Sequence, residues 1–140
     1  MSVFTWAARV YWEDTDGGGI VYYANYLRFL ERARTEWLRS LGHSQQELAQ
    51  TQGILFAVAG LSIEYRRPAR LDDELTITCE PGLERATVLR FAQQILRRTG
   101  SADTNLLVTA QVRVVCVDAR TLKPKKLPDF LLAGLSLERS

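Results

Sequence analysis

Three carboxylates and three glycines fall within Glu13–Gly19, directly before a predicted helix. Glycine lets the backbone approach a ligand closely, and the first turn of a helix offers unpaired N–H groups and the positive end of a dipole. Such a site can polarise a carbonyl oxygen and stabilise an oxyanion. A carboxylate held beside it, Asp14 or Asp16, can act as nucleophile or general base toward an acyl carbon.

The same segment has other interpretations. Asp14 or Asp16 can simply cap a turn, as Asp-Gly pairs do. A calcium loop of the EF-hand type fails because Asn25 stands where a bidentate Glu is required, and no phosphate-loop pattern occurs. A serine hydrolase is rejected because Gly60–Ser62 lacks the second glycine of a nucleophile elbow. The single histidine, His43, leaves no partner for a His-based metal site.

The elements around this loop follow from hydrophobic spacing. Residues of Val3–Trp12 alternate between apolar and polar, which predicts a strand with Trp12 on its apolar side. From Tyr26 to Leu41 the apolar residues recur at helical spacing. Asn25 is the expected N-cap of this helix and Gly42 the expected stop.

A second helix and four further strands are predicted downstream. Ser44–Glu47 has capping-box spacing and begins a short helix that Gly53 ends. After it, apolar and polar residues alternate, which is typical of strands with one solvent-exposed face, over 61–66, 75–80, 89–95 and 108–116. Pro81-Gly82 and residues 99–101 are the clearest turn signals.

This order of elements predicts an α+β fold in a single domain over residues 1–140. One long helix lies on one strongly curved, antiparallel, five-stranded sheet. A single helix covers only part of such a face, so apolar surface and a strand edge stay exposed. We therefore expect a homo-oligomer.

Composition limits the classes of function. Lys and Arg number 18 and Asp and Glu 16, and a net charge of +2 is too weak to predict binding to nucleic acid or a membrane surface. No stretch approaches the roughly 18 apolar residues of a membrane span. Residues 1–10 lack the features of a signal peptide, so the expected location is cytoplasmic. Cys79 and Cys116 are expected to be reduced thiols, and no cofactor or metal is expected.

The segment 9–39, RVYWEDTDGGGIVYYANYLRFLERARTEWLR, closely resembles the hotdog-fold acyl-CoA thioesterases of the 4-hydroxybenzoyl-CoA thioesterase family. It is most similar to the branch found with the Tol–Pal cell-envelope system of Gram-negative bacteria. The resemblance extends to EYRRPARLDDELTI at 64–77 and KPKKLP at 123–128. It implies the hotdog fold, a long helix wrapped by an antiparallel sheet, assembled as a homodimer or homotetramer.

The resemblance also implies an activity and the residues that carry it. The activity is hydrolysis of a short-chain aliphatic or aromatic acyl-CoA. Asp16 matches the catalytic aspartate, as nucleophile or general base, and the backbone N–H of Tyr23 matches the group that polarises the carbonyl. Members of the Tol–Pal branch often carry His where Tyr23 stands. Arg85 and Lys123 match basic positions expected to contact the phosphates of coenzyme A.

Two alternatives belong to other functional classes. A hotdog dehydratase or hydratase depends on a pocket histidine, but His43 follows the long helix, where the family places no catalytic group. The other alternative is a non-catalytic or weakly catalytic hotdog module that binds acyl carrier protein or phospholipid-synthesis partners. Thioester hydrolysis measured over aliphatic and aromatic acyl-CoAs distinguishes that module from an enzyme.

Overall fold

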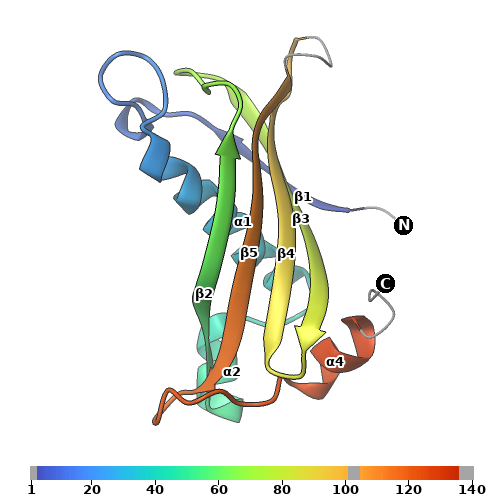
Figure 1. Cartoon of the computed structure of the whole chain (residues 1–140). Coiled ribbons are helices and arrows are strands. Elements are labelled where there is room, and N and C mark those ends of the chain that lie inside the picture. The colour runs from blue at the N-terminus through green and yellow to red at the C-terminus, as the bar shows by residue number, and fades with distance from the viewer. Residues whose placement is uncertain (1–2, 101–104, 136–140) are drawn as a thin grey trace.

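The computed structural model describes residues 3–100 and 105–135. Its strands form one antiparallel sheet in the order β1-β3-β4-β5-β2, and α1 lies across one face of that sheet (Figure 1). The elements are β1 (Phe4–Arg9), the 3-10 turns η1 (Trp12–Asp14) and η2 (Tyr23–Asn25), α1 (Tyr26–Ser40), α2 (Gln45–Gln52), β2 (Ile54–Tyr65), β3 (Glu74–Arg85), β4 (Val88–Arg97), β5 (Leu106–Asp118) and α4 (Asp129–Leu135).

The predicted α+β architecture is confirmed, and its core lies between α1 and the sheet. Residues that share one side recur at every second position along a strand and about every 3.6 positions along a helix. Each element turns its apolar side inward, and these sides pack against one another in the core. Both cysteines are buried and free. The core includes Phe29, Leu30, Ala33 and Trp37 from α1 and Leu75, Ile77, Cys79, Phe91, Ile95, Val108, Val112 and Cys116 from the sheet.

Helix α1 begins and ends where the sequence predicts, but its N-terminal contact differs. Gly42 follows the helix with φ 90°, the left-handed conformation expected of a stop. The Asn25 side chain makes no capping bond. Its Nδ2 instead donates to the carbonyl of Asp14 at 2.9 Å, so this residue fastens the preceding loop to the helix.

The predicted second helix is also confirmed, and the strand after it is longer than expected. Ser44 Oγ accepts the N–H of Glu47 at 3.1 Å, and Gly53 ends α2 with φ 65°. Strand β2 then starts at once, at Ile54, well before Leu61. Its first half escaped the sequence analysis because it is apolar on both faces.

The predicted turn at Pro81-Gly82 is wrong. Strand β3 runs through both residues, Pro81 pairs with Phe91, and the chain reverses at Ala86–Thr87. Proline is tolerated here because β1 pairs with β3 only as far as Cys79. Beyond that residue β3 is locally an edge, where a missing N–H breaks no ladder bond.

The structure differs from the sequence analysis at Trp12 and at the C-terminal helix, and it describes only part of the predicted turn at 99–101. Trp12 is not on the apolar side of a strand, because β1 ends at Arg9 and Trp12 is exposed in η1. The turn after β4 contains Gly100 with φ 108°, whereas Ser101 lies outside the described residues. Helix α4 was not predicted. Among the described residues, no helix is long and apolar enough to cross a membrane.

Candidate active site

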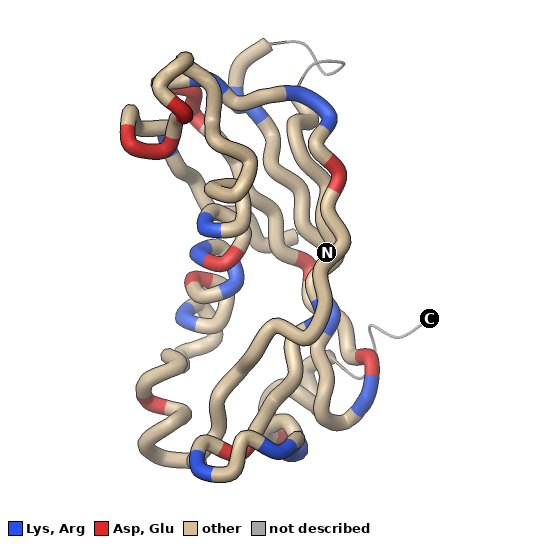
Figure 2. The backbone as a smooth tube through the Cα atoms, turned by 60° about the vertical axis from the view of Figure 1, so that its left-hand side comes forward, with Lys and Arg blue, Asp and Glu red and all other residues tan. Residues whose placement is uncertain are grey.

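The acidic loop between β1 and α1 is tied to the segment that precedes β3. It lies at one end of the molecule (Figure 1), and several Asp and Glu positions gather along its backbone (Figure 2). Its strand-like ends find partners in the neighbouring segment, and four backbone hydrogen bonds of 2.9 Å fix it: Val10 N–H to Asp73, Asp72 N–H to Val10, Val21 N–H to Ala69, and Leu71 N–H to Gly19. The flexible glycines are thus confined between two anchored ends.

The two aspartates of this loop have different contacts. Asp14 Oδ2 accepts the N–H of Tyr11 at 2.8 Å, and its carbonyl accepts the N–H of Tyr22 at 3.1 Å. Asp16 is exposed, and its Oδ1 accepts the N–H of Gly18 at 2.7 Å. No other hydrogen bond within the described residues reaches the Asp16 carboxylate. One of its oxygens is therefore open to a ligand.

The start of the helical segment lies at the same loop. An antiparallel bridge between Thr15 and Val21 closes the loop, with Asp16 just inside the bridge and Tyr23 two residues outside it. Tyr23 is the first residue of η2, which leads directly into α1. The backbone N–H groups of Tyr23 and Ala24 find no acceptor among the described residues, as expected at a helical start. Unpaired donors and an open carboxylate therefore share one loop.

A cluster of tyrosines holds this helical start against the end of β2. Tyr65 Oη donates to the carbonyl of Tyr23 at 3.3 Å, and its ring lies 5.5 Å from that of Tyr26. Tyr26 Oη accepts the N–H of Ala69 at 2.9 Å. Burial raises the pKa of both Tyr26 and Tyr65, so both stay protonated at neutral pH. The sequence analysis missed Tyr65, whose place on the inward side of β2 was its only signal.

Arg85 lies far from this loop within one subunit. The loop adjoins the Glu74 end of β3, since Val10 is bonded to Asp73. Arg85 is at the other end of this 12-residue strand. At about 3.3 Å per residue the two ends are about 36 Å apart. One subunit therefore does not bring Arg85 and Asp16 together.

Lys123 is also at the far end of the molecule. Tyr65, beside the helical start, pairs with Val108 near the beginning of β5, whereas Ile54 pairs with Asp118 at its end. Lys123 follows that end, and its carbonyl accepts the N–H of Asp118 at 2.8 Å. Its side chain has no hydrogen bond or ion pair within the described residues. By the strand pairing, both cationic candidates thus lie at the end opposite the acidic loop, the end where β3 turns into β4 (Figure 1).

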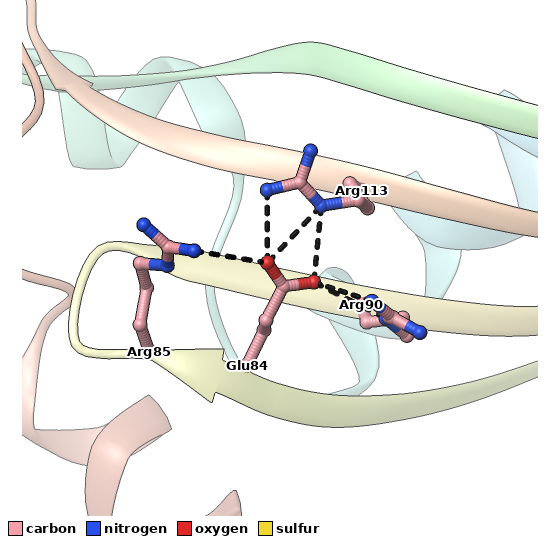
Figure 3. A network of polar contacts seen from close by, with 4 residues as sticks. All are labelled: Glu84, Arg85, Arg90 and Arg113. Atoms are coloured by element: carbon pink, nitrogen blue, oxygen red, sulfur yellow. Dashed lines mark hydrogen bonds and ion pairs between the residues drawn. The ribbon is translucent and has the colours of Figure 1, made fainter.

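Arg85 belongs to a network around one carboxylate on the outer face of the sheet (Figure 3). Arg113 binds both oxygens of Glu84, with Nη2 to Oε2 at 2.8 Å, and Arg90 Nη2 binds Oε1 at 2.8 Å. Arg85 is looser, with Nη2 at 3.7 Å from Oε2. Hydrogen bonds from Arg113 and Arg90 lower the pKa of Glu84 to about 2. Three guanidinium groups around one carboxylate leave an excess of positive charge.

The comparisons with known proteins agree with this architecture. Residues 10–135 match the family model described as the thioesterase-like superfamily. The chain is 47% identical over 132 residues to the acyl-CoA thioester hydrolase YbgC of Escherichia coli O6:H1, covering 94% of this chain and 95% of that protein. It is 35% identical to a probable thioesterase from Bartonella henselae, with a TM-score of 0.82 over 91% of this chain and 100% of that one.

A second solved structure shows the same fold from end to end. A 1,4-dihydroxy-2-naphthoyl-CoA thioesterase from Synechocystis has a TM-score of 0.85 and 26% identity, covering 99% of this chain and 100% of that one. The family resemblance of the segment 9–39 is therefore confirmed. The chain belongs to the thioesterase-like superfamily, as a hotdog thioesterase in the Tol–Pal-associated branch that contains the YbgC proteins.

Proposed function

We propose that this thioesterase hydrolyses acyl-CoA esters, with Asp16 and the backbone N–H of Tyr23 as its reacting groups. The observation that carries the proposal is their shared loop, where one oxygen of Asp16 has no partner among the described residues and the N–H groups that begin η2 are unpaired. The relatives named as acyl-CoA and naphthoyl-CoA thioester hydrolases support the substrate class.

These groups suffice for thioester hydrolysis. The N–H of Tyr23 donates to the thioester carbonyl oxygen and stabilises the negative charge that develops there. Asp16 takes a proton from water as the water oxygen bonds to the carbonyl carbon. When the C–S bond breaks, that proton passes to the sulfur of coenzyme A and Asp16 is again a carboxylate. In the nucleophilic route, an Asp16 oxygen bonds to the carbonyl carbon and the C–S bond breaks to release the coenzyme A thiolate. Water then cleaves the resulting anhydride into the product acid and the Asp16 carboxylate, and the proton released protonates the thiolate.

The edge strand β2 supports assembly of the site from two subunits. It has 12 residues and ends the sheet on one side. Its large apolar residues Leu55, Val58, Leu61 and Tyr65 are 38–56% exposed in the single chain. A long apolar edge of this kind is stabilised by pairing with another strand. Twofold pairing of β2 with its copy is antiparallel and continues the sheet.

This pairing also accounts for the distance between Asp16 and the two cationic candidates within one subunit. An antiparallel β2 pair sets the Tyr65 end of one strand beside the Ile54 end of the other. Asp16 of the partner subunit then approaches the end of the molecule that carries Arg85 and Lys123. We therefore place the thioester at the loop of one subunit and the phosphates of coenzyme A on cations of the other.

The test of the activity is thiol release from a panel of aliphatic and aromatic acyl-CoAs by the wild-type protein. We expect catalytic release for some members, and the absence of release from all of them overturns the proposal. A single turnover in oxygen-18 water followed by mass spectrometry of the protein tests the nucleophilic route. Label in Asp16 indicates an anhydride that water attacks at the Asp16 carbonyl carbon, whereas label confined to the product acid is expected both from the general base and from attack on the acyl carbon.

The test of the composite site is the oligomeric state. Leu61→Lys places a charge on the exposed β2 edge, and we expect it to reduce both the dimer fraction in light scattering and the activity. Gln50→Lys, on the exposed side of α2, is the matched control and should change neither. A monomer with full activity contradicts the composite site.

A further inference from the structure

A pocket outside the acidic loop lies between α1 and the inner face of the sheet, next to the β2 edge. Most of its wall is apolar and includes Trp37 from α1, Phe56 and Val58 from β2 and Phe91 from β4. Two charged residues of α1, Glu31 and Arg34, also line it. An apolar pocket with a few polar groups is the usual form of a small-molecule site.

Arg34 is the group in this pocket that needs a partner. It is largely removed from solvent, and burial lowers its pKa. Its Nη1 donates to Gln93 Oε1 at 3.0 Å. No carboxylate within the described residues lies close enough to form an ion pair with it. A guanidinium has five N–H donors, so most of those of Arg34 have no protein acceptor.

The lack of a bound carboxylate distinguishes Arg34 of α1 from two arginines of the sheet. Arg97 lies 3.1 Å from Asp73, and Arg113 lies 2.8 Å from Glu84. Arg34 has instead a neutral amide, whose Nε2 is fixed by the carbonyl of Leu30 at 3.1 Å. The nearby carboxylate of Glu31 favours the charged form of Arg34, but it makes no ion pair or hydrogen bond with the guanidinium, whose burial is costly. The charge of Arg34 is available to a ligand.

The unbonded nitrogens of Arg34 are not fully buried. Among the described residues no buried side-chain nitrogen or oxygen lacks a hydrogen bond, so these nitrogens keep some contact with open space, and Arg34 is one of the residues that line the pocket. The other charged group, Glu31, is engaged with Thr35, whose hydroxyl donates to Oε2 at 2.9 Å. The geometry therefore offers an apolar channel with donors at one point of its wall.

The β2 pairing places this pocket beside the partner's reacting groups. Phe56 and Val58 lie in the first half of β2, the half that faces the Tyr65 end of the partner strand in an antiparallel pair. The acyl chain of a thioester at Asp16 of the partner subunit can then enter between α1 and β2. We propose that this pocket binds the acyl group and that Arg34 binds a carboxylate at its far end.

The substrate class is therefore acyl-CoA esters of dicarboxylic acids. This inference rests on the proposed function, since it takes acyl-CoA hydrolysis at Asp16 as given. The apolar wall accommodates methylene groups, and the charged hydrogen bond to Arg34 distinguishes an ω-carboxylate from a methyl end. Loss of such a bond changes kcat/KM by about tenfold or more.

The test compares adipyl-CoA with hexanoyl-CoA, two esters of six carbons that differ at the far end. We expect wild type to prefer adipyl-CoA. Arg34→Met should lower kcat/KM for adipyl-CoA by about tenfold and change that for hexanoyl-CoA by less than about threefold. Arg34→Lys should recover part of the preference. Arg32→Met, on the exposed side of α1, is the matched control and should behave as wild type.

A binding measurement separates this inference from the proposed function. Free adipate should stabilise wild type against heat more than hexanoate does, and Arg34→Met should lose the difference, whether or not thioesters are hydrolysed. Equal loss on both esters, or an unaltered preference in Arg34→Met, overturns the role of Arg34. Failure to hydrolyse any acyl-CoA overturns the proposed function instead.

Mixed dimers test the placement of the pocket. Asp16→Asn and Arg34→Met subunits, unfolded together and refolded, give heterodimers in which one of the two composite sites is intact. Adipyl-CoA activity should rise to about a quarter of wild type, above the mean of the two parents. No rise above that mean shows that Asp16 and Arg34 act within one subunit and overturns the composite placement.

Discussion

Asp16 and Glu84 are carboxylates with opposite surroundings. Glu84 uses both oxygens to bind Arg90 and Arg113, and their hydrogen bonds lower its pKa to about 2. Asp16 receives one backbone N–H, from Gly18, and keeps an open oxygen. A carboxylate surrounded by guanidinium groups joins strands, whereas a carboxylate with one weak partner on an anchored loop can react. The hydrogen-bond and ion-pair partners of each carboxylate, and not its residue type, distinguish a structural role from a reactive one.

Asp16→Asn tests whether the Asp16 carboxylate reacts with the substrate, and of the substitutions considered it should have the largest effect on activity. The amide cannot take a proton from water or attack a carbonyl carbon, so kcat should fall by at least about a hundredfold. Steady-state kinetics with the preferred acyl-CoA measure the fall, and circular dichroism verifies the fold. Near-normal turnover in a folded protein rules out the assignment.

Asp14→Asn is the matched control for that substitution. It should cost less activity than Asp16→Asn, because Asp14 acts through its bonds to Tyr11 and Tyr22 and not on the substrate. If the two variants lose the same activity, the comparison between a shaping and a reacting aspartate fails.

Tyr23→Pro removes the backbone donor that we place on the thioester carbonyl. The preceding Tyr22 has φ −64° and ψ 131°, which is compatible with a following proline, and proline is favoured at the first position of a helical segment. We expect kcat to fall by about a hundredfold. Tyr23→His keeps the N–H and should stay within several-fold of wild type. Equal kinetics for the two variants would show that this N–H is not used.

Glu84→Gln tests the structural side of the comparison. The pKa of Glu84 is lower in the folded protein than its ordinary value near 4.5, so its contribution to stability is complete above that pH and is lost as the pH falls toward about 2. Denaturant unfolding should show Glu84→Gln about 1 kcal/mol less stable than wild type at pH 7. The difference should shrink between pH 5 and pH 3.

Glu80→Gln is the control for this pH dependence. Glu80 is exposed on the same strand and has no ion pair within the described residues. Its substitution should leave the free energy of unfolding within about 0.5 kcal/mol of wild type. A pH-independent loss in Glu84→Gln contradicts the ion-pair explanation.

Arg85→Ala and Lys123→Ala should have the smallest effects. Exposed contacts to phosphate contribute on the order of 1 kcal/mol each, so KM for acyl-CoA should rise several-fold with kcat little changed. An acyl-N-acetylcysteamine, which lacks the nucleotide, should be used as well by both variants as by wild type. Equal losses on the two substrates mean that these residues support structure.

The fold was largely readable from the sequence because periodicity reports burial. The long helix, its stop at Gly42 and the capped second helix all follow from local spacing and local caps. The errors arose where tertiary pairing overrides local signals. Pro81 suggests a turn in the sequence, but β1 pairs with β3 only as far as Cys79, so the strand can continue through the proline. Asn25 suggests an N-cap, but its side chain donates to the carbonyl of Asp14 instead.

The positions of the candidate site residues were less predictable from the sequence. They depend on which strands pair and in which register, and local sequence patterns do not specify this. The acidic loop and the helical start adjoin in sequence, which indicated this loop, and the family resemblance singled out Asp16 and Tyr23 within it. Arg90 and Arg113 fall on the solvent face by alternation, but only the strand register brings both to Glu84. The separation of Arg85 from the loop depends on strand length and direction, which local motifs do not give.

The half of β3 beyond Cys79 bears on solubility. It has no neighbouring strand on the β1 side, and such edges are templates for aggregation. Pro81 removes one donor from that template, and α4 packs against the same strand (Figure 1). The two features leave β2 as the one long side of the described sheet that can accept another strand. The proline that suggests a turn in the sequence thus lowers the capacity of this stretch of β3 to pair with another strand.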